Sequence, residues 1–162
     1  VSKDSMDLGE KLVEFIAIAI PNNHYHFLIR EVSEGGVSKF MQKFGIAYTN
    51  YFNEKHNRSG GLFQGAFKAK HVDTNEYLLR VSSYINLNDK VHSSRYRIPG
   101  ITSLTSWFNY IQGFGINLKL DKGIILEQFN SIDQYKDFAL STLNSIMRNK
   151  ILVNELKQDG LL

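Results

Sequence analysis

The first third of the chain alternates between strand-like and helix-like spacing of its hydrophobic positions. Residues 11–20 are apolar and rich in β-branched side chains, and Pro21 opens a turn before a second extended run at residues 24–31. This pattern predicts a β-hairpin. Apolar side chains then recur every three or four positions from Val37 to Phe52, which predicts an amphipathic helix whose aromatic side chains lie in the core.

Local signals predict the next strand and the next helix. Residues 62–72 have the composition of an extended segment. Asp73 followed by Glu76 has the spacing of a capping box, so we expect a helix to begin there and to continue through Asn88. Tyr84 and Asn88 are four positions apart on that helix, so the tyrosine hydroxyl and the amide project from one helix face.

Helical signals dominate the last third of the chain. The aromatic run at residues 107–110 predicts a short helix, and residues 123–129 predict another. Ser131 with Gln134 forms a second capping-box pattern, and the apolar positions that follow it lie on one helical face. We therefore expect a helical region at the end of the chain.

The composition fits a folded chain that can bury a core. Its 162 residues are 43% hydrophobic, which favours one domain or one domain with an appendage. The absence of cysteine excludes disulfides and thiolate ligands, so any bound metal must be held by nitrogen and oxygen. The longest unbroken apolar run, residues 15–20, is too short to span a membrane, and we expect a cytoplasmic protein.

Positive charge is concentrated in the middle of the chain. The formal net charge is only +3, but the stretch from Lys39 to Arg97 has ten basic against four acidic residues. Lys68 and Lys70 share one face of the strand predicted at residues 62–72. This excess points to an anionic partner, of which nucleic acid is the commonest. On charge alone a solvated basic face would be the preferred interpretation, and only the motifs described below favour the anionic partner.

Two histidines separated by one residue are the clearest candidate for chemistry. On an extended strand His24 and His26 share a face, and two adjacent imidazoles can hold one divalent metal ion. The alternative is that one or both rings are only solvated or hydrogen-bonded. Tyr84 and Asn88 also have a structural alternative, in which Tyr84 is a core aromatic and Asn88 caps the end of its helix.

Four motifs in order resemble those of a known family. They read Pro-Asn-Asn-His-Tyr-His-Phe-Leu-Ile, Leu-Phe-Gln-Gly-Ala-Phe-Lys-Ala-Lys, Asn-Glu-Tyr-Leu-Leu and Ser-Tyr-Ile-Asn-Leu-Asn. From about Lys11 to Lys90 the chain resembles the single-tyrosine HUH transposases of the insertion-sequence 200/605 type, and especially their REP-associated relatives. The likeness continues more loosely into the aromatic run near residue 107.

The resemblance assigns a role to each candidate residue. His24 and His26 match the family's His-hydrophobic-His metal ligands, and Tyr84 matches its nucleophile. Asn88 matches the third metal ligand, and asparagine at this place favours the REP-associated branch over the branch that uses glutamine. Magnesium or manganese is the expected functional ion, although zinc or nickel could bind such nitrogen and oxygen ligands more tightly.

The chain departs from the family pattern at three places. Two asparagines, not one, separate Pro21 from His24, and Asp89 stands where the family usually has a proline. The strand and helix that normally precede the hairpin are mostly lacking, which predicts an N-terminally truncated catalytic domain.

The resemblance and the hydrophobic pattern together predict an α+β fold. We expect an antiparallel sheet with helices packed on one face, ferredoxin-like as in HUH endonucleases. We expect residues 1–98 to form the transposase-like catalytic domain and residues 99–162 a helical C-terminal region packed on it.

The predicted activity is cleavage and joining of single-stranded DNA. Tyrosine is a poor nucleophile unless a metal or base assists it, and attack by Tyr84 would leave a covalent 5′-phosphotyrosine. The substrate is expected to be hairpin-bearing single-stranded DNA, and the protein a monomer or homodimer. The side chains expected to contact the strand are Arg58, Gln64, Phe67, Lys68, Lys70 and Arg80.

Two other functions remain open from the sequence. One is a non-catalytic domain that binds single-stranded nucleic acid on the same scaffold. The other is a metal-dependent phosphodiester hydrolase in which Tyr84 has only a structural role. A covalent protein–DNA adduct would distinguish the transposase-like reaction from both.

Overall fold

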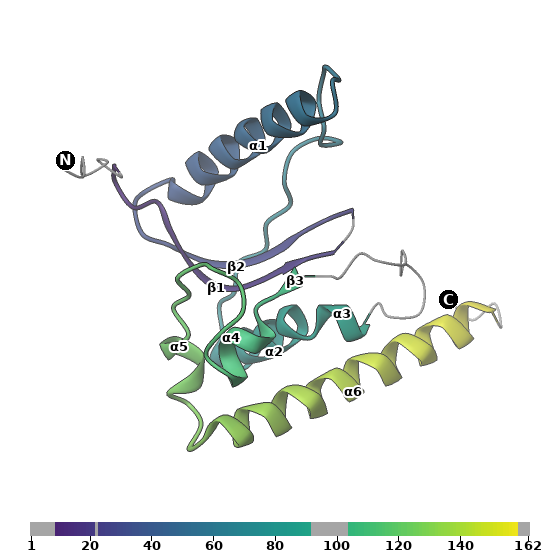
Figure 1. Ribbon diagram of the computed structural model, residues 1–162. Coiled ribbons are helices and arrows are strands. Elements are labelled where there is room, and N and C mark those ends of the chain that lie inside the picture. Colours follow the sequence, from purple (N-terminus) through teal and green to yellow (C-terminus); the bar gives the residue numbers. More distant parts are fainter. Residues whose placement is uncertain (1–8, 22, 92–103, 159–162) are drawn as a thin grey trace. The chain divides into compact units, whose positions relative to one another are not determined.

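The computed structural model describes residues 9–21, 23–91 and 104–158 of the chain (Figure 1). In chain order its elements are β1 (Val13–Ile20), β2 (His26–Glu31), α1 (Gly36–Lys55), α2 (Asn75–Asn86), α3 (Asn88–Val91), β3 (Leu104–Thr105), α4 (Trp107–Ile111), α5 (Gly123–Leu126) and α6 (Ile132–Gln158). No helix within these described residues is long and apolar enough to cross a membrane.

The described residues group into two compact units. The first comprises residues 9–14 and 29–71, and it contains α1 and the segment that follows it. The second comprises residues 15–21, 23–28, 72–91 and 104–158, and it contains α2 to α6 and β3. The domain boundary predicted at residue 98 lies outside the described residues and stays a prediction.

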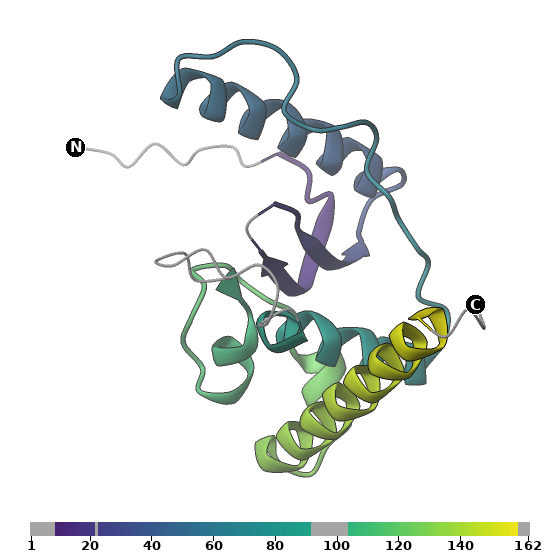
Figure 2. The same cartoon turned by 90° about the vertical axis from the view of Figure 1, so that its right-hand side faces the viewer.

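Three strands form the sheet, in the order β2-β1-β3. β3 runs antiparallel to β1, with Ala19 opposite Thr105 and Ile20 opposite Leu104. In both views the helices of the second unit gather on one side of β1 (Figures 1 and 2). The α+β prediction is therefore confirmed. One strand comes from the C-terminal region, which was expected to be helical only.

The second unit has a continuous hydrophobic core built from the sheet and five helices. Its buried members are Ile16, Ala17, Ala19, Leu28, Ile85, Leu87, Val91, Trp107, Tyr110, Ile125, Tyr135, Ala139 and Leu143. The three contributed by α6 are four residues apart, as the amphipathic pattern predicts. The predicted cap of this helix is also confirmed, because the Gln134 N–H donates to Ser131 Oγ over 3.1 Å.

The aromatic side chains of α1 do not form the core that the sequence pattern predicted. The helix itself is confirmed, but Met41 is its buried large side chain, while Tyr48 and Tyr51 are 42% and 56% exposed. Within the first unit, Tyr48 instead stacks along the helix on Phe44, with ring centroids 6.0 Å apart. It also contacts the ring of Phe63, with centroids 6.1 Å apart. Periodicity predicted the helix correctly, but the prediction that its aromatic face is buried was wrong.

The strand predicted at residues 62–72 is absent from the described structure. Gly65 has a φ of 109°, which lies outside the extended region, and most of the surrounding side chains are exposed. An apolar, extended-looking segment becomes a strand only when a neighbouring strand satisfies its backbone groups. No described strand pairs with these residues.

The helix after this segment begins one residue later than predicted. Its N-cap is Thr74, not Asp73, and Thr74 Oγ1 accepts a hydrogen bond from the Tyr77 N–H over 3.2 Å. Threonine and aspartate are both good N-caps, so the sequence alone could not choose between adjacent candidates. Glu76 lies in the first turn, where a negative charge is favourable.

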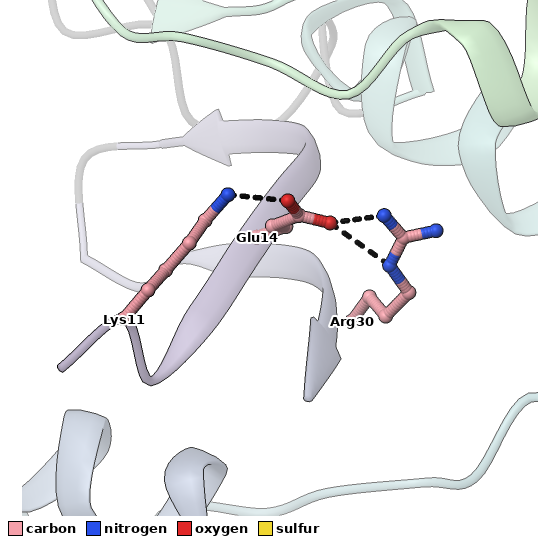
Figure 3. Close-up of polar contacts among 3 residues, drawn as sticks. All are labelled: Lys11, Glu14 and Arg30. Atoms are coloured by element: carbon pink, nitrogen blue, oxygen red, sulfur yellow. Dashed lines mark hydrogen bonds and ion pairs between the residues drawn. The ribbon is translucent and has the colours of Figure 1, made fainter. Parts of the chain in front are cut away.

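Glu14 links the two hairpin strands through ion pairs. Its carboxylate on β1 pairs with Lys11 and with Arg30 on β2, and Arg30 Nε lies 2.9 Å from Glu14 Oε2 (Figure 3). The hydrogen bonds from Lys11 and then Arg30 hold the pKa of Glu14 below its ordinary value. A depressed carboxyl pKa contributes stability at neutral pH, and this is lost as pH falls through the folded-state pKa. Exposed pairs of this kind contribute little.

Gly36 lies where α1 begins and where another segment crosses closely. A Cβ atom at this position would lie 2.2 Å from the backbone oxygen of Leu12. That oxygen also accepts a hydrogen bond from the Val32 N–H over 3.0 Å, so moving the oxygen would weaken that bond. The start of α1 therefore requires glycine for space.

We predict that Gly36→Ala lowers the free energy of unfolding by about 1–3 kcal/mol, the usual cost of an overpacked site. Gly45→Ala is the matched control, because it lies inside the same helix and its Cβ would meet nothing within 4 Å. That change should raise stability by about 1 kcal/mol through helix propensity. Urea denaturation of both variants measures the difference, and equal effects would contradict the close approach.

Candidate active site

His24 and His26 lie side by side at the start of β2. The strand begins at His26, so His24 precedes it and is not a strand residue as predicted. The two rings are nevertheless adjacent, with centroids 4.9 Å apart and planes at 84°. His24 Nδ1 lies 2.7 Å from Asn23 Oδ1, which fixes the orientation of the exposed ring. The predicted histidine pair is therefore close in space, although not through a shared strand face.

Tyr84 lies next to the histidine pair. Its ring centroid on α2 is 5.6 Å from that of His26, at an interplanar angle of 74°. The tyrosine is half-buried, and its ring packs on the hydrophobic core of the second unit. His24, His26 and Tyr84 are thus linked by ring contacts, because the His26 ring contacts each of the other two.

Asn88 lies on a different helix from Tyr84. α2 ends at Asn86, Leu87 is its C-cap with φ −106° and ψ 19°, and α3 begins at Asn88. The prediction that Tyr84 and Asn88 lie on one continuous helix was therefore wrong. Hydrophobic spacing gives no signal for this turn, because the turn depends on tertiary packing of the fully buried Leu87. The alternative in which Asn88 caps the helix is not supported, since the cap is Leu87.

The side chain of Asn88 is fully buried without satisfying its polar atoms. Its exposed fraction is 0%, and in the described part of the chain neither Oδ1 nor Nδ2 has a hydrogen-bond partner. A buried polar group without a partner costs about 1–3 kcal/mol, so native proteins rarely keep one without a functional reason. An amide oxygen of this kind is a suitable ligand for a divalent cation.

The donor types of His24, His26 and Asn88 suit the divalent ion that the sequence predicts. Two imidazoles and one amide oxygen are neutral donors that accept a range of divalent ions. Among the described residues, no group of three or more His, Cys, Asp or Glu side chains could hold an ion. Any site at His24 and His26 therefore needs a different third donor, and the unsatisfied amide of Asn88 supplies that type.

The residues predicted to contact DNA are divided between the two units. In the first unit, Arg58 donates to the Gly61 oxygen over 3.2 Å and lies 5.7 Å from the centre of the Phe52 ring. In the second unit, Arg80 Nη1 lies 4.0 Å from Glu76 Oε1. The other candidates are all exposed side chains of the first unit: Gln64, Phe67, Lys68 and Lys70.

Two other tyrosines of the second unit are poorly suited to nucleophilic attack. Burial raises the pKa of Tyr135 to about 12, and burial also raises the pKa of Tyr110 far above its ordinary value. Tyr110 moreover donates its hydroxyl proton to the Ile16 oxygen over 2.9 Å. Neither phenol is exposed to a substrate, so the half-buried Tyr84 remains the candidate.

Sequence reasoning missed a second set of buried polar residues near this site. Ser82, Ser83 and Asn86 on α2 are at most 1% exposed, as is Ser106 before α4. The sequence signal that could have revealed them is the number of polar residues on the same helix face as the apolar Ile85. The single tryptophan, Trp107, is also buried here, and the Lys90 ammonium of α3 lies 5.6 Å from its ring centroid.

We predict opposite effects for the same substitution at two buried asparagines. Asn88→Leu should raise the free energy of unfolding of the metal-free protein by about 1 kcal/mol, because it removes unsatisfied polar atoms. It should also abolish stabilisation by added Mn²⁺. Asn86→Leu should destabilise by about 1–3 kcal/mol, because Asn86 has hydrogen-bond partners on both amide atoms.

Thermal denaturation in EDTA and then in Mn²⁺ measures both effects. If the metal-free Asn88→Leu protein is destabilised, or if Mn²⁺ still stabilises it, then the Asn88 side chain is not a ligand of the metal ion.

Comparison with known proteins assigns the chain to a family. A family model described as Transposase IS200 like matches residues 8–88, which is half of the chain. Both histidines, Tyr84 and Asn88 lie within the matched stretch. No curated protein and no solved structure matches the chain. The chain therefore belongs to the IS200-like transposase family, as its ordered motifs indicated.

Proposed function

We propose that this chain cleaves and rejoins single-stranded DNA with Tyr84 as the covalent nucleophile. Membership of the IS200-like transposase family implies an enzyme that cuts and joins DNA. The observation that carries the residue assignment is the ring contact of Tyr84 with His26. The assignment of Asn88 is supported by its buried amide, which is unsatisfied in the described structure.

In this reaction the Tyr84 oxygen attacks a backbone phosphorus atom in line with the 3′-oxygen that leaves. A Tyr84 oxygen–phosphorus bond forms, the phosphorus–3′-oxygen bond breaks, and the phenol proton passes to solvent while the leaving oxygen takes one up. The product is a 5′-phosphotyrosine and a free 3′-hydroxyl. Because a phosphodiester is retained, a 3′-hydroxyl can attack it and rejoin a strand, so the step is reversible.

His24, His26 and Asn88 are the residues that we propose hold a divalent ion, with magnesium or manganese as the functional choice. A bound divalent ion supplies charge stabilisation at the non-bridging phosphate oxygens and can lower the pKa of a nearby nucleophile. The chain itself supplies two fixed imidazoles and orients them, through the Asn23 contact at His24 and the ring contact at His26. Asparagine at residue 88 supports closeness to the REP-associated branch, and the proposed substrate is a hairpin-bearing single strand of DNA.

We predict that Tyr84→Phe abolishes the covalent adduct and strand cleavage while DNA binding persists. The change removes only a hydroxyl, so stability should fall by no more than about 1 kcal/mol. Tyr77→Phe is the matched control, since it removes a hydroxyl from a half-buried tyrosine on the same helix. Denaturing gels of the proteins with end-labelled hairpin oligonucleotides and Mn²⁺ detect the adduct.

A Tyr84→Phe protein that still forms the adduct would show that another residue is the nucleophile. A protein that cleaves without any adduct would favour a hydrolase in which water attacks. Binding without cleavage by the unaltered chain, across a library of hairpin substrates, would favour a domain that only binds nucleic acid.

The exposed lysines of the first unit are proposed to contribute sequence-independent binding to the DNA backbone. Lys68 and Lys70 are exposed, and they lie in the stretch with ten basic against four acidic residues. Phosphate contacts of this kind release counterions, so affinity falls steeply as salt rises. Arg58 is less available for this role, because its guanidinium already contacts Gly61 and Phe52.

We predict that Lys68→Ala with Lys70→Ala weakens single-stranded DNA binding and makes it less sensitive to salt. The slope of log affinity against log salt should become shallower by about 0.7 for each lost contact. The control pair Lys119→Ala with Lys136→Ala removes the same charge from exposed positions outside the basic stretch. Fluorescence anisotropy over a salt series measures the slope, and equal slopes for both pairs would contradict this role.

A further inference from the structure

A chain of buried hydrogen bonds connects four elements of the second unit. The Ile18 N–H on β1 donates to Ser106 Oγ over 3.0 Å, and the Ser106 hydroxyl donates to Asn86 Oδ1. Asn86 Nδ2 then donates to the Tyr135 hydroxyl oxygen on α6 over 2.7 Å. Ser106, Asn86 and Tyr135 are all 0% exposed, so no solvent competes with these bonds.

The direction of these bonds fixes how Asn86 is oriented. Ser106 Oγ accepts from the Ile18 N–H, and its single proton has two acceptors within reach. The contact with Asn86 Oδ1 is the shorter, and the Ile18 oxygen lies 3.3 Å away. The amide nitrogen of Asn86 is thereby directed to Tyr135. In an interior of low dielectric such bonds are strong and directional, and they favour one packing arrangement over near alternatives.

Asn86 lies midway in the sequence between Tyr84 and Asn88, which the proposed chemistry requires. It is the last residue of α2, two positions after Tyr84 and two before Asn88. The chain turns at Leu87, so the angle between α2 and α3 is set at this point. A side chain anchored on β1 and α6 here therefore controls where both neighbours lie relative to the sheet that carries His26.

We infer that Asn86, Ser106 and Tyr135 are positioning residues for Tyr84 and Asn88, an inference that rests on the proposed function. Residues of the C-terminal region thus hold the end of α2 in its working orientation. The catalytic unit extends to α6, well beyond residue 88, where the match to the family model ends. The C-terminal region is part of the reaction apparatus and not an appendage to it.

Two buried tyrosines provide a matched test of this role. Tyr135→Phe removes the hydroxyl that Asn86 binds, whereas Tyr110→Phe removes a hydroxyl that binds the Ile16 backbone oxygen. Tyr135 and Tyr110 are 0% and 1% exposed, so both variants lose a buried hydrogen bond in the same core. Only Tyr135→Phe leaves Asn86 without a partner for its amide nitrogen.

The expected result is a split between rate and binding. With saturating hairpin DNA and Mn²⁺, Tyr135→Phe should lower the single-turnover cleavage rate at least tenfold, with DNA affinity changed less than twofold. Its affinity for Mn²⁺, measured by calorimetry without DNA, should fall at least threefold. In the metal-free protein, amide hydrogen exchange over residues 85–91 should quicken. Tyr110→Phe should leave the cleavage rate, both affinities and the exchange rates within twofold of the unaltered chain.

Equal behaviour of the two tyrosine variants would overturn the inference. If Tyr135→Phe does not fold, Ser106→Ala tests the same chain of bonds from its other end, with the same three readouts expected to change. The proposed function fails separately, when Tyr84→Phe retains the adduct. The hydrogen-exchange comparison does not depend on cleavage, so it tests the positioning role in either case.

Discussion

The buried amide of Asn86 is the point at which the strands, the helix of Tyr84 and the C-terminal helix are joined. A polar group in a dry core must find partners, and here they come from residues 20 and 49 positions away in the sequence. Removing either partner leaves one atom of the buried Asn86 amide unsatisfied. The two-residue strand β3, which is too short to be stable by itself, is held in register by Ser106 beside it.

Asn86 and Asn88 are the same residue type two positions apart, but their buried side chains have opposite effects on stability. Both are fully buried, but only the first has hydrogen-bond partners on both amide atoms in the described structure. The satisfied amide stabilises the fold, while the unsatisfied one costs stability. In the proposed metal site, a bound cation would offset that cost.

Much of this arrangement is predictable from sequence because its signals are local. The spacing of apolar residues predicts α1 and α6, the Ser131 cap predicts where α6 begins, and the ordered motifs predict the residues of the site. The misses all depend on contacts between distant residues. They include the turn at Leu87, the strand β3, the exposure of Tyr48 and Tyr51, and the absence of a strand at residues 62–72. Periodicity reports that a face is apolar but does not report what covers it.

The position of Trp107 gives the chain an internal optical reporter. It is the sole tryptophan in the sequence, it is buried, and the Lys90 ammonium that lies over its ring is two residues from Asn88. Indole emission responds to a nearby cation and to polarity, so displacement of α3 would change the colour and intensity of the fluorescence. The proposed binding of a cation at Asn88 can therefore be tested in the unlabelled protein, in real time and without a substrate.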